Sequence, residues 1–405
     1  MTLALGLASG FIKNRLWLSE AAIALLLGVL IGPACLGLFN LDPVQPADGF
    51  IVREAARVSL AIAIMAAGTR LPSGYLRAHA GELLVVLVAG MSGMWLMTSL
   101  VTAVMLQSSL LVTVLVAACV TPTDPVLAAS ILTGADAERR IPARLRNILS
   151  AESGANDGLG MIFVLLPVSF LTQRGPDAAL SAWAWRGVLV DLTASVFLGA
   201  AFGYLAAWLY RAVQGTLFAE RASIVTVNVS LALFTVAAIG LIGGDGLLGV
   251  FAAAVVFATR TDEQRTEASE RFQEAVKRFF ELPVLVLLGV ALPWGAWSNL
   301  GWLALAYPLV AIVLRRLPVW LVLARFMPSL TDTRDRWFAG WFGPVGISGL
   351  FYVLLAMRET GHAAPWIYGS MIMLASVLLH GIAATPLTRF YAPKPDKEIR
   401  VVPGR

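Results

Sequence analysis

The sequence predicts an all-α membrane protein that crosses the bilayer many times. Of its 405 residues, 58% are hydrophobic and only 14% are charged, and the mean hydropathy of +0.79 lies well above that of soluble domains. The apolar residues form runs of about 20, the length that an α-helix needs to cross a hydrocarbon core of about 30 Å. Uninterrupted runs of this kind exclude a transmembrane β-barrel, whose strands alternate apolar and polar residues.

The rest of the composition excludes several other classes. Cys35 and Cys119 lie in or near apolar runs, so we expect neither a disulfide framework nor a thiolate metal site. The isoelectric point near 9.5 does not indicate a nucleic-acid partner, because the basic residues are spread over short loops. Residues 1–12 lack a basic residue before their apolar run, so we expect no cleaved signal peptide. Nothing in the sequence indicates a bound organic cofactor.

The apolar runs predict about thirteen membrane-spanning helices. The predicted spans cover residues 1–12, 20–39, 52–71, 82–107, 110–133, 144–171, 187–210, 222–242, 246–260, 280–293, 301–325, 336–356 and 365–385. Between the ninth and tenth spans, residues 263–278 carry charges at helical spacing, which predicts an amphipathic helix on the cytoplasmic surface.

The distribution of basic residues predicts the orientation of these spans, because Lys and Arg collect in cytoplasmic loops. An outer N-terminus and a cytoplasmic C-terminus place most basic residues in the cytoplasm. Only five arginines then remain on the opposite side: Arg53, Arg57, Arg174, Arg186 and Arg358.

Thirteen spans divide into two sets of six and one linker, and a single linker helix inverts the second set. We expect one transmembrane domain, residues 1–386, followed by a short cytoplasmic tail, residues 387–405. Within the domain, repeat one covers residues 1–171, the linker helix 187–210 and repeat two 222–386. Inverted repeats are typical of secondary transporters, whose binding sites lie at interrupted helices in matching positions of the two repeats.

Proline and glycine predict such an interruption in the fifth and twelfth helices. Proline removes a helical hydrogen-bond donor, and glycine permits the dihedral angles of an unwound segment. The fifth helix carries Pro122 and Pro125, and the twelfth carries Gly343, Pro344 and Gly346.

Acidic residues next to the first interruption predict an ion-binding site. Carboxylates at bilayer depth cost roughly 2.5–3.5 kcal/mol each, so they persist where they line a polar pathway or pair with a partner. Asp157 lies about 13 residues past Arg144, or roughly 20 Å along a helix, close to mid-membrane. Polar residues recur around it on one helical face and beside Pro125. We expect Asp157, Asp124, Thr123, Asn156 and Ser153 to bind the ion, with Asp157, Thr123 and Ser153 as direct ligands of a metal cation.

Two alternatives stay open for these residues. Thr123 or Asp124 also suits the N-cap of a helix that starts at Pro125. Asp157 in its neutral form also suits a polar contact between helices. A desolvated carboxyl has a raised proton affinity, and one that titrates near cytoplasmic pH exchanges a proton for a cation.

Glu152, on the same face as Asp157, needs a cation partner. Arg315 and Arg316 lie well inside the predicted span 301–325, away from both of its ends, so we expect one of them to pair with Glu152. The alternative is that both reach the cytoplasmic interface.

Other polar and small residues have simpler interpretations. We expect His380 to be a hydrogen-bonded core residue and Asp245 to lie in a turn. Glu20, Glu82 and Glu281 lie at span ends, where a solvated position is the default. The pairs Gly28/Gly32 and Gly199/Gly203 predict close helix packing.

The two motifs around Asp124 and Asp157 resemble those of the monovalent cation:proton antiporter-1 family, the NhaP-like relatives of animal sodium/proton exchangers. Thr123-Asp124-Pro125 is similar to the family's broken fifth helix, and Glu152-Ser153-Gly154-Ala155-Asn156-Asp157 to its sixth-helix motif. The resemblance implies a bacterial inner-membrane protein, a homodimer with a moving core domain, and electroneutral exchange because Asn156 precedes Asp157.

The resemblance also implies a structural ion pair between Glu152 and Arg315, because Arg315-Arg316-Leu317-Pro318-Val319 is similar to the family's Arg-x-Leu-x-Val pattern. One position departs from the family. Many relatives carry an arginine in the twelfth helix where this chain has Val345, so any role of that arginine is absent or moved.

Together, these observations predict secondary active antiport of Na⁺ or Li⁺ against H⁺, with both competing for Asp157. The runner-up is K⁺/H⁺ antiport, because the sequence does not reveal the cation radius that the site fits. A passive channel is a weaker alternative. A remote one is an intramembrane aspartic protease, which needs two carboxyl groups that share a proton.

Overall fold

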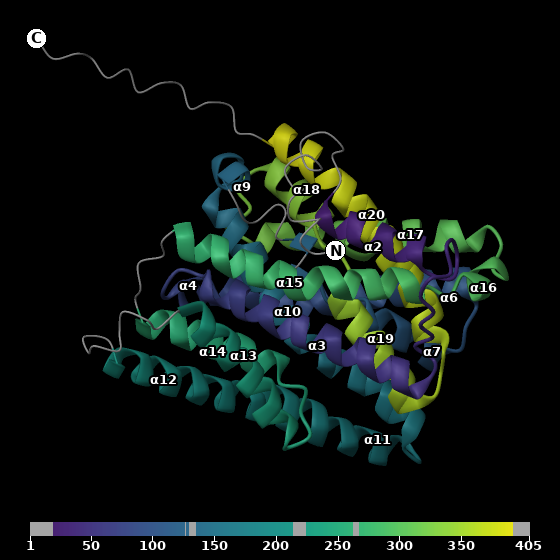
Figure 1. The fold of residues 1–405 in the computed structure, drawn as a ribbon, viewed down its shortest axis with the longest axis horizontal. Coiled ribbons are helices and arrows are strands. Elements are labelled where there is room, and N and C mark those ends of the chain that lie inside the picture. Colours follow the sequence, from purple (N-terminus) through teal and green to yellow (C-terminus); the bar gives the residue numbers. More distant parts are fainter. Residues whose placement is uncertain (1–18, 126, 129–134, 214–223, 262–266, 392–405) are drawn as a thin grey trace, which may run out of the picture.

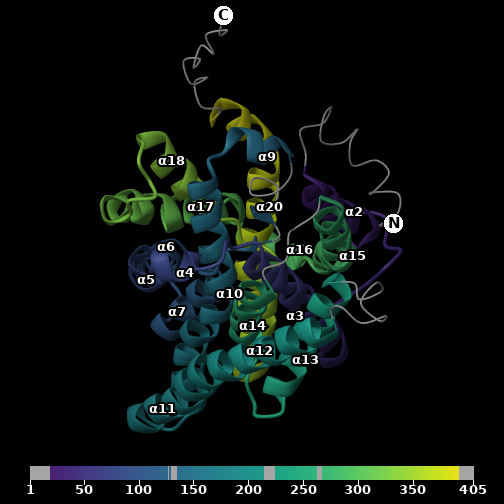
Figure 2. The same ribbon diagram turned by 90° about the vertical axis from the view of Figure 1, so that its left-hand side faces the viewer.

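The computed structural model describes residues 19–125, 127–128, 135–213, 224–261 and 267–391. Throughout these residues the secondary structure is helical, with no strand, which confirms the all-α class. The helices α3 (Pro46–Thr69), α12 (Ser195–Val213), α14 (Leu247–Thr261) and α15 (Glu267–Ala291) run side by side in Figure 1, and α18 (Thr333–Trp341) lies at the edge of the molecule opposite α12. Figure 2 shows the same bundle after a quarter turn.

The helices up to Thr172 are α2 (Glu20–Ile31), α3 (Pro46–Thr69), α4 (Tyr75–Ala78), α5 (Ala80–Leu84), the π-helical η2 (Val85–Gly90), α6 (Met91–Leu106), α7 (Leu110–Cys119), α9 (Ala135–Arg140) and α10 (Ala143–Thr172). The later helices are α11 (Pro176–Trp183), the π-helical η3 (Ala184–Ala194), α12 (Ser195–Val213), α13 (Ile224–Gly240), α14 (Leu247–Thr261), α15 (Glu267–Ala291), α16 (Trp294–Ser298), α17 (Leu303–Leu323), the 3₁₀ turn η5 (Ala324–Phe326), α18 (Thr333–Trp341), α19 (Ile347–Thr360) and α20 (Ala364–Tyr391).

Four continuous helices in the described part of the chain are long and apolar enough to cross a membrane: Ala80–Leu106, Ala143–Thr172, Pro176–Val213 and Ala364–Tyr391. Shorter apolar helices, such as Ile224–Gly240 and Leu247–Thr261, overlap other predicted spans. The predicted span 1–12 lies outside the described residues. The total of thirteen spans therefore stays a prediction.

One predicted boundary is wrong. Residues 263–278 were expected to form a separate surface helix, but α15 runs without interruption from Glu267 through the predicted span 280–293. Lys277 and Glu281 are both buried in it and lie 3.4 Å apart. Each neutralises the other at a spacing of one helical turn, so the helix carries both charges into the protein.

Glycine lets two helix pairs approach closely, as the GxxxG spacings predicted. Gly28 and Gly32 of α2 lie against the backbone of α15, and Gly199 and Gly203 of α12 lie against that of α14. A Cβ atom at Gly28, Gly199 or Gly203 would lie 2.0–2.4 Å from a main-chain oxygen of the neighbouring helix, and one at Gly32 would lie 3.0 Å from the main chain of α15.

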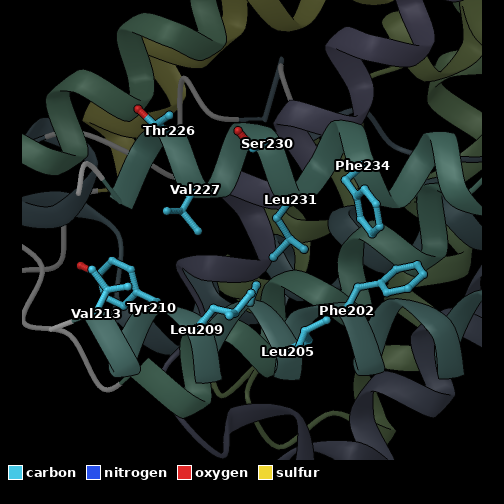
Figure 3. Close-up of a pocket in the computed structure, with 11 residues that line it drawn as sticks. Phe202, Leu205, Leu209, Tyr210, Val213, Thr226, Val227, Ser230, Leu231 and Phe234 are labelled. Atoms are coloured by element: carbon cyan, nitrogen blue, oxygen red, sulfur yellow. The ribbon is translucent and has the colours of Figure 1, made fainter. Parts of the chain in front are cut away.

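The outer surface of α12 and α13 is apolar, as expected for helices in contact with lipid. Phe197, Leu205 and Trp208 each expose half or more of their area. An open groove of about 570 Å³ lies between these two helices (Figure 3), with Phe202, Leu209 and Phe234 among the side chains that line it. None of the residues in the predicted ion site lines this groove.

Candidate ion-binding site

The site is built on two interrupted helices that meet inside the bundle. Helix α7 ends at Cys119, and the next residues, up to Asp124, are buried but not helical. In the second half of the chain, α18 ends at Trp341 and α19 begins at Ile347, so the interruption predicted at Gly343, Pro344 and Gly346 is present. The main-chain N–H of Asp124 donates to the carbonyl of Pro344 at 2.8 Å. The two interruptions therefore form one unit.

Arg315 of α17 binds the carbonyl ends of both interrupted helices. Its buried guanidinium donates to the carbonyls of Val120 and Gly343, to that of Thr121 at 3.0 Å and to that of Pro122 at 3.3 Å. The last carbonyls of a helix have no partner within the helix and carry partial negative charge. A single buried cation thus stabilises the C-terminal ends of α7 and α18.

Asp124 supplies the opposite charge at the start of α19. Its Oδ2 accepts a hydrogen bond from the N–H of Ile347, the first residue of that helix. A carboxylate at a helix N-terminus satisfies an unpaired donor and interacts favourably with the helix dipole. A Cβ atom at Gly346 would lie 2.5 Å from the same oxygen, so the position requires glycine. Asp124, predicted as an ion ligand, binds a helix terminus of the other half of the chain.

Glu152 of α10 pairs with Arg316, so the predicted partner, Arg315, is wrong. Arg316 donates to the two carboxylate oxygens at 2.8 and 3.2 Å, and both side chains are buried. The guanidinium also donates to the carbonyl of Ala339 at 3.0 Å and lies 4.0 Å above the ring of Trp320. Consecutive residues of a helix point about 100° apart. Since Arg315 faces the two interruptions, Arg316 faces α10.

Asn156 and Thr123 complete this network. The Asn156 side chain donates to the Thr123 hydroxyl and to Glu152 Oε1, both at 2.7 Å. Its oxygen accepts from the N–H of Thr123 at 3.2 Å, and the Thr123 hydroxyl donates to Glu152 Oε1 at 3.2 Å. The broken segment after α7 is thus fastened to α10 by side chains that are all buried.

Asp157 differs from every acid around it. It is fully buried in the middle of α10, and neither of its carboxylate oxygens has a hydrogen-bond partner. Among the described residues, Asp157 is the only buried acidic residue that has no hydrogen-bond partner on either carboxylate oxygen. The Ser348 hydroxyl, in the first turn of α19, lies next to the carboxyl, outside hydrogen-bond geometry. The Tyr352 hydroxyl donates to the main-chain carbonyl of Asp157.

Comparison with known proteins assigns the family. The family model described as sodium/hydrogen exchanger, transmembrane, matches residues 1–390. The chain belongs to this family of transmembrane sodium/hydrogen exchangers. A relative from Zygosaccharomyces rouxii, Na⁺/H⁺ antiporter 2, is 31% identical over 87% of this chain and 44% of its own length. The K⁺/H⁺ antiporter NhaP2 of a Shewanella species is 26% identical over 93% of this chain and 63% of its own length.

This exchanger also shares its fold with a solved structure. The sodium proton antiporter MjNhaP1 from Methanocaldococcus jannaschii matches 97% of both chains with a TM-score of 0.73 and 18% identity. At that identity the match shows the fold alone. The chain spans less than two thirds of the length of the curated relatives given above. Members of the family are multi-pass membrane transporters and not enzymes, so the protease alternative loses its support.

The ligands predicted for a transported cation are only partly brought together. Ser153 lies one turn before Asp157 on α10, and its hydroxyl lies 3.5 Å from the carbonyl of Ser150. Thr123 contacts Asn156 and Glu152, but no contact with Asp157 is seen. Among the described residues, no three His, Cys, Asp or Glu side chains are grouped to hold a resident metal ion.

Two other predicted positions have clear surroundings. His380 is buried and hydrogen-bonded to Ser376 and to the carbonyl of Trp341 at 3.0 Å, as expected of a core histidine. Val345 is buried, and its N–H donates to the Ser376 hydroxyl at 2.7 Å. The position where the resemblance implies an arginine in many relatives is thus filled by an apolar side chain.

The sequence analysis did not single out Ser348 and Tyr352. A serine or tyrosine in an apolar helix is common, so neither residue type carries a strong signal. The available signal was position. Ser348 follows the predicted interruption at Gly346 by two residues, in the turn that enters the site.

Proposed function

We propose that this exchanger is a secondary active antiporter that exchanges Na⁺ or Li⁺ for H⁺, one for one, and that the two substrates compete for Asp157. The observation that carries the proposal is a buried carboxyl with two unpartnered oxygens in the middle of a helix long enough to cross a membrane. The family and the antiporter names of the relatives support the same activity.

Because Asp157 is buried, the free energy of its carboxylate depends on whether a proton or a cation is bound. An unpaired carboxylate in a low-dielectric interior is strongly disfavoured, and a proton or a bound cation removes that cost. The Ser348 hydroxyl provides an oxygen atom beside Asp157, and Ser153 lies one turn before Asp157 on α10; hydroxyl oxygens suit a hard cation. The conformational change then requires Asp157 to hold a proton or a cation. Either one lowers the free energy of the buried site, whereas the empty site keeps an uncompensated charge.

The arrangement of charges supports electroneutral exchange. Arg316 neutralises Glu152, Asp124 binds the N-terminus of α19, and Arg315 binds carbonyl groups. Asp157 is left as the one carboxylate of this group whose charge changes during the cycle. One carboxylate takes up one proton or one monovalent cation, so the same charge crosses the membrane in each direction.

The larger assembly belongs to the same proposal. We infer two inverted repeats, residues 1–171 and 222–386, joined by the linker helix 187–210, with a core that moves against a dimerisation domain in a homodimer. The tail, residues 387–405, is then cytoplasmic and the N-terminus lies outside. The bacterial inner membrane stays a prediction, since the relatives above include a yeast protein and a bacterial one.

K⁺/H⁺ antiport is the second candidate. The observation in its favour is the similarity to the Shewanella NhaP2, which is named a K⁺/H⁺ antiporter. The same carboxyl serves either cation, and the choice depends on the size of the loaded site.

Proton movement in proteoliposomes tests the activity. We expect Na⁺ or Li⁺ to cause alkalinisation or acidification, reported by a pH-sensitive dye, at an unchanged rate when the membrane potential is clamped. Asp157→Asn should fold, with an unchanged melting temperature or a higher one, and should lose this signal. Exchange by Asp157→Asn at the wild-type rate would falsify the mechanism. A response to K⁺ alone would establish the second candidate, and cation flux without proton movement would indicate a channel.

A further inference from the structure

A second pair of buried acids lies outside the group around Asp157. Asp191 belongs to η3, and Asp245 lies in the turn before α14, 54 residues later. The N–H of Asp245 donates to Asp191 Oδ1 at 2.8 Å, and the N–H of Leu247 donates to Asp245 Oδ1 at 2.9 Å. The two residues are 1% and 6% exposed, so both carboxyl groups are held in the interior by main-chain donors.

Only half of each carboxyl group is used. Asp191 Oδ2 and Asp245 Oδ2 are both buried and have no hydrogen-bond partner. The turn predicted at Asp245 accounts for its Oδ1 and leaves its Oδ2 unexplained. The Thr235 hydroxyl, also buried and unpartnered, belongs to a side chain that packs against Gly249, one turn beyond Asp245. Leaving a buried acceptor unsatisfied costs about 1–3 kcal/mol, and more for a charged group.

The neighbouring cations bind other atoms. Arg57 of α3 donates to the main-chain carbonyl of Asp245 at 2.9 and 3.2 Å and pairs with Glu54 at 3.5 Å. Arg186 of η3 pairs with Glu359 at 3.2 Å. Both guanidinium groups are within electrostatic range of the pair, but neither donates to its carboxylates. Two carboxylates so close together favour a form in which they hold a proton.

Tyr352 and the contact between α10 and α14 connect the pair to the part of α10 that carries Asp157. Tyr352 of α19 is within electrostatic range of Asp157, Asp191 and Asp245, and its hydroxyl donates to the carbonyl of Asp157. Gly158, next to Asp157, packs against Leu248, where a Cβ atom would lie 2.5 Å from the main chain. Asp245 lies one turn before Leu248, in the direction that the predicted topology assigns to the outer face.

We propose that Asp191 and Asp245 form a second proton-binding site, which exchanges protons between the outer face and Asp157. This inference rests on the proposed function. A proton leaves an Oδ2 of the pair and binds a carboxylate oxygen of Asp157, and the pair regains a proton from outer water. No other bond changes. Arg57, Arg186 and Tyr352 are the charged and titratable groups around the pair, and Glu54 and Glu359 pair with the two arginines.

Asparagine variants test the role of the pair in transport. Asp191→Asn, Asp245→Asn and the double variant keep the Oδ1 acceptors and lose only the ability to hold the proton. In proteoliposomes, with the pH of each face set separately, we expect the cation-driven proton flux of the double variant to fall about tenfold when the outer face is alkaline, where one pKa unit is a tenfold change in proton affinity. At acidic outer pH its rate should approach that of the wild type. Asp177→Asn, an exposed acid in the first turn of α11, is the matched control.

A second measurement is independent of transport. In the Asp157→Asn background, infrared difference spectra between alkaline and acidic solutions should contain a carboxylic-acid band that disappears in either single variant and persists in Asp177→Asn. An outer-pH profile identical to the wild type, a loss equal at every pH, or a band unchanged in both single variants would overturn the inference. If the wild type moves no protons at all, the proposed function fails instead, and the infrared band still reports whether the pair holds a proton.

Discussion

Arg315 and Arg316 show how much two adjacent residues of the same type differ in role. Arg315 binds main-chain carbonyls at the ends of two helices, and Arg316 binds the Glu152 carboxylate. The first neutralises partial charges and the second a full charge. The consequences of removing them should therefore differ.

Substitution of Glu152 should distinguish the two arginines. Arg316→Gln leaves Glu152 buried without its cation, and breaking a buried pair in this way costs about 3–5 kcal/mol. Adding Glu152→Gln removes the stranded charge, so we expect the double variant to recover much of the lost melting temperature in detergent. Arg315→Gln should not be rescued by Glu152→Gln. Equal rescue of both arginine variants would contradict the pairing described here.

At the scale of elements, the ends of three helices meet at Asp335. This residue of α18 lies just before the predicted span 336–356 and is buried. Arg144, at the start of α10, donates to it at 2.8 Å, and the Tyr391 hydroxyl, at the end of α20, donates to its other oxygen. Burial alone would raise the pKa of Asp335, but the hydrogen bonds from Tyr391, Arg144 and the Asp332 N–H outweigh it and lower the pKa below its ordinary value.

This cluster predicts a loss of stability in acid. A carboxyl with a lowered pKa in the folded state stabilises the protein fully above the unfolded value of about 3.9, and the contribution is lost as the pH falls through that value to the lower folded pKa. We expect Asp335→Asn to lower the melting temperature at pH 7 and to differ less from the wild type below about pH 4. Asp332→Asn is the control, because asparagine also caps a helix. A difference between Asp335→Asn and wild type that stays constant from pH 7 to pH 3 would rule out this linkage.

The sequence predicted elements well where local chemistry decides them. Pro122, Gly343, Pro344 and Gly346 mark interruptions because no helix accommodates those residues without losing hydrogen bonds or gaining unusual dihedral angles. The break predicted between residues 263–278 and the span 280–293 is absent from α15. The charges of the segment look exposed, which suggested a separate surface helix. Whether Lys277 is exposed depends on Glu281 one turn later and on the helices around it, which the local pattern does not contain.

At the scale of the molecule, the natural cysteines offer a test of the predicted orientation. Cys35 is exposed, just after α2, and the predicted topology places it at the outer end of span 20–39. Cys119 is buried at the end of α7. A membrane-impermeant maleimide added to intact cells should label the wild type at Cys35 and leave Cys35→Ser unlabelled. Labelling that requires permeabilised membranes would reverse the proposed orientation.

The sequence predicted which residues make up the candidate site better than it predicted which of them contact one another. Thr123, Glu152 and Asn156 share a network as the helical spacing on α10 suggested. The choice between Arg315 and Arg316 depended on the rotation of α17 about its axis. The role of Asp124 depended on α19 lying beside a residue 223 positions earlier in the chain, and the role of Ser348 depended on the same approach of α19. The packing of the whole bundle decides which of these residues, far apart in the sequence, come into contact.

The joining of the two interrupted helices has a consequence for biogenesis. Thr121 and the arginine that binds its carbonyl are 194 residues apart. At about 5–20 residues per second, a ribosome needs roughly 10–40 s to synthesise that interval. During this time the first interrupted helix resides in the translocon or the membrane with its terminal carbonyls unpaired, and a nascent chain that ends before Ile347 also lacks the amide that binds Asp124. The carbonyl groups that end the first interrupted helix therefore have no access to Arg315 until the second half of the chain has been synthesised.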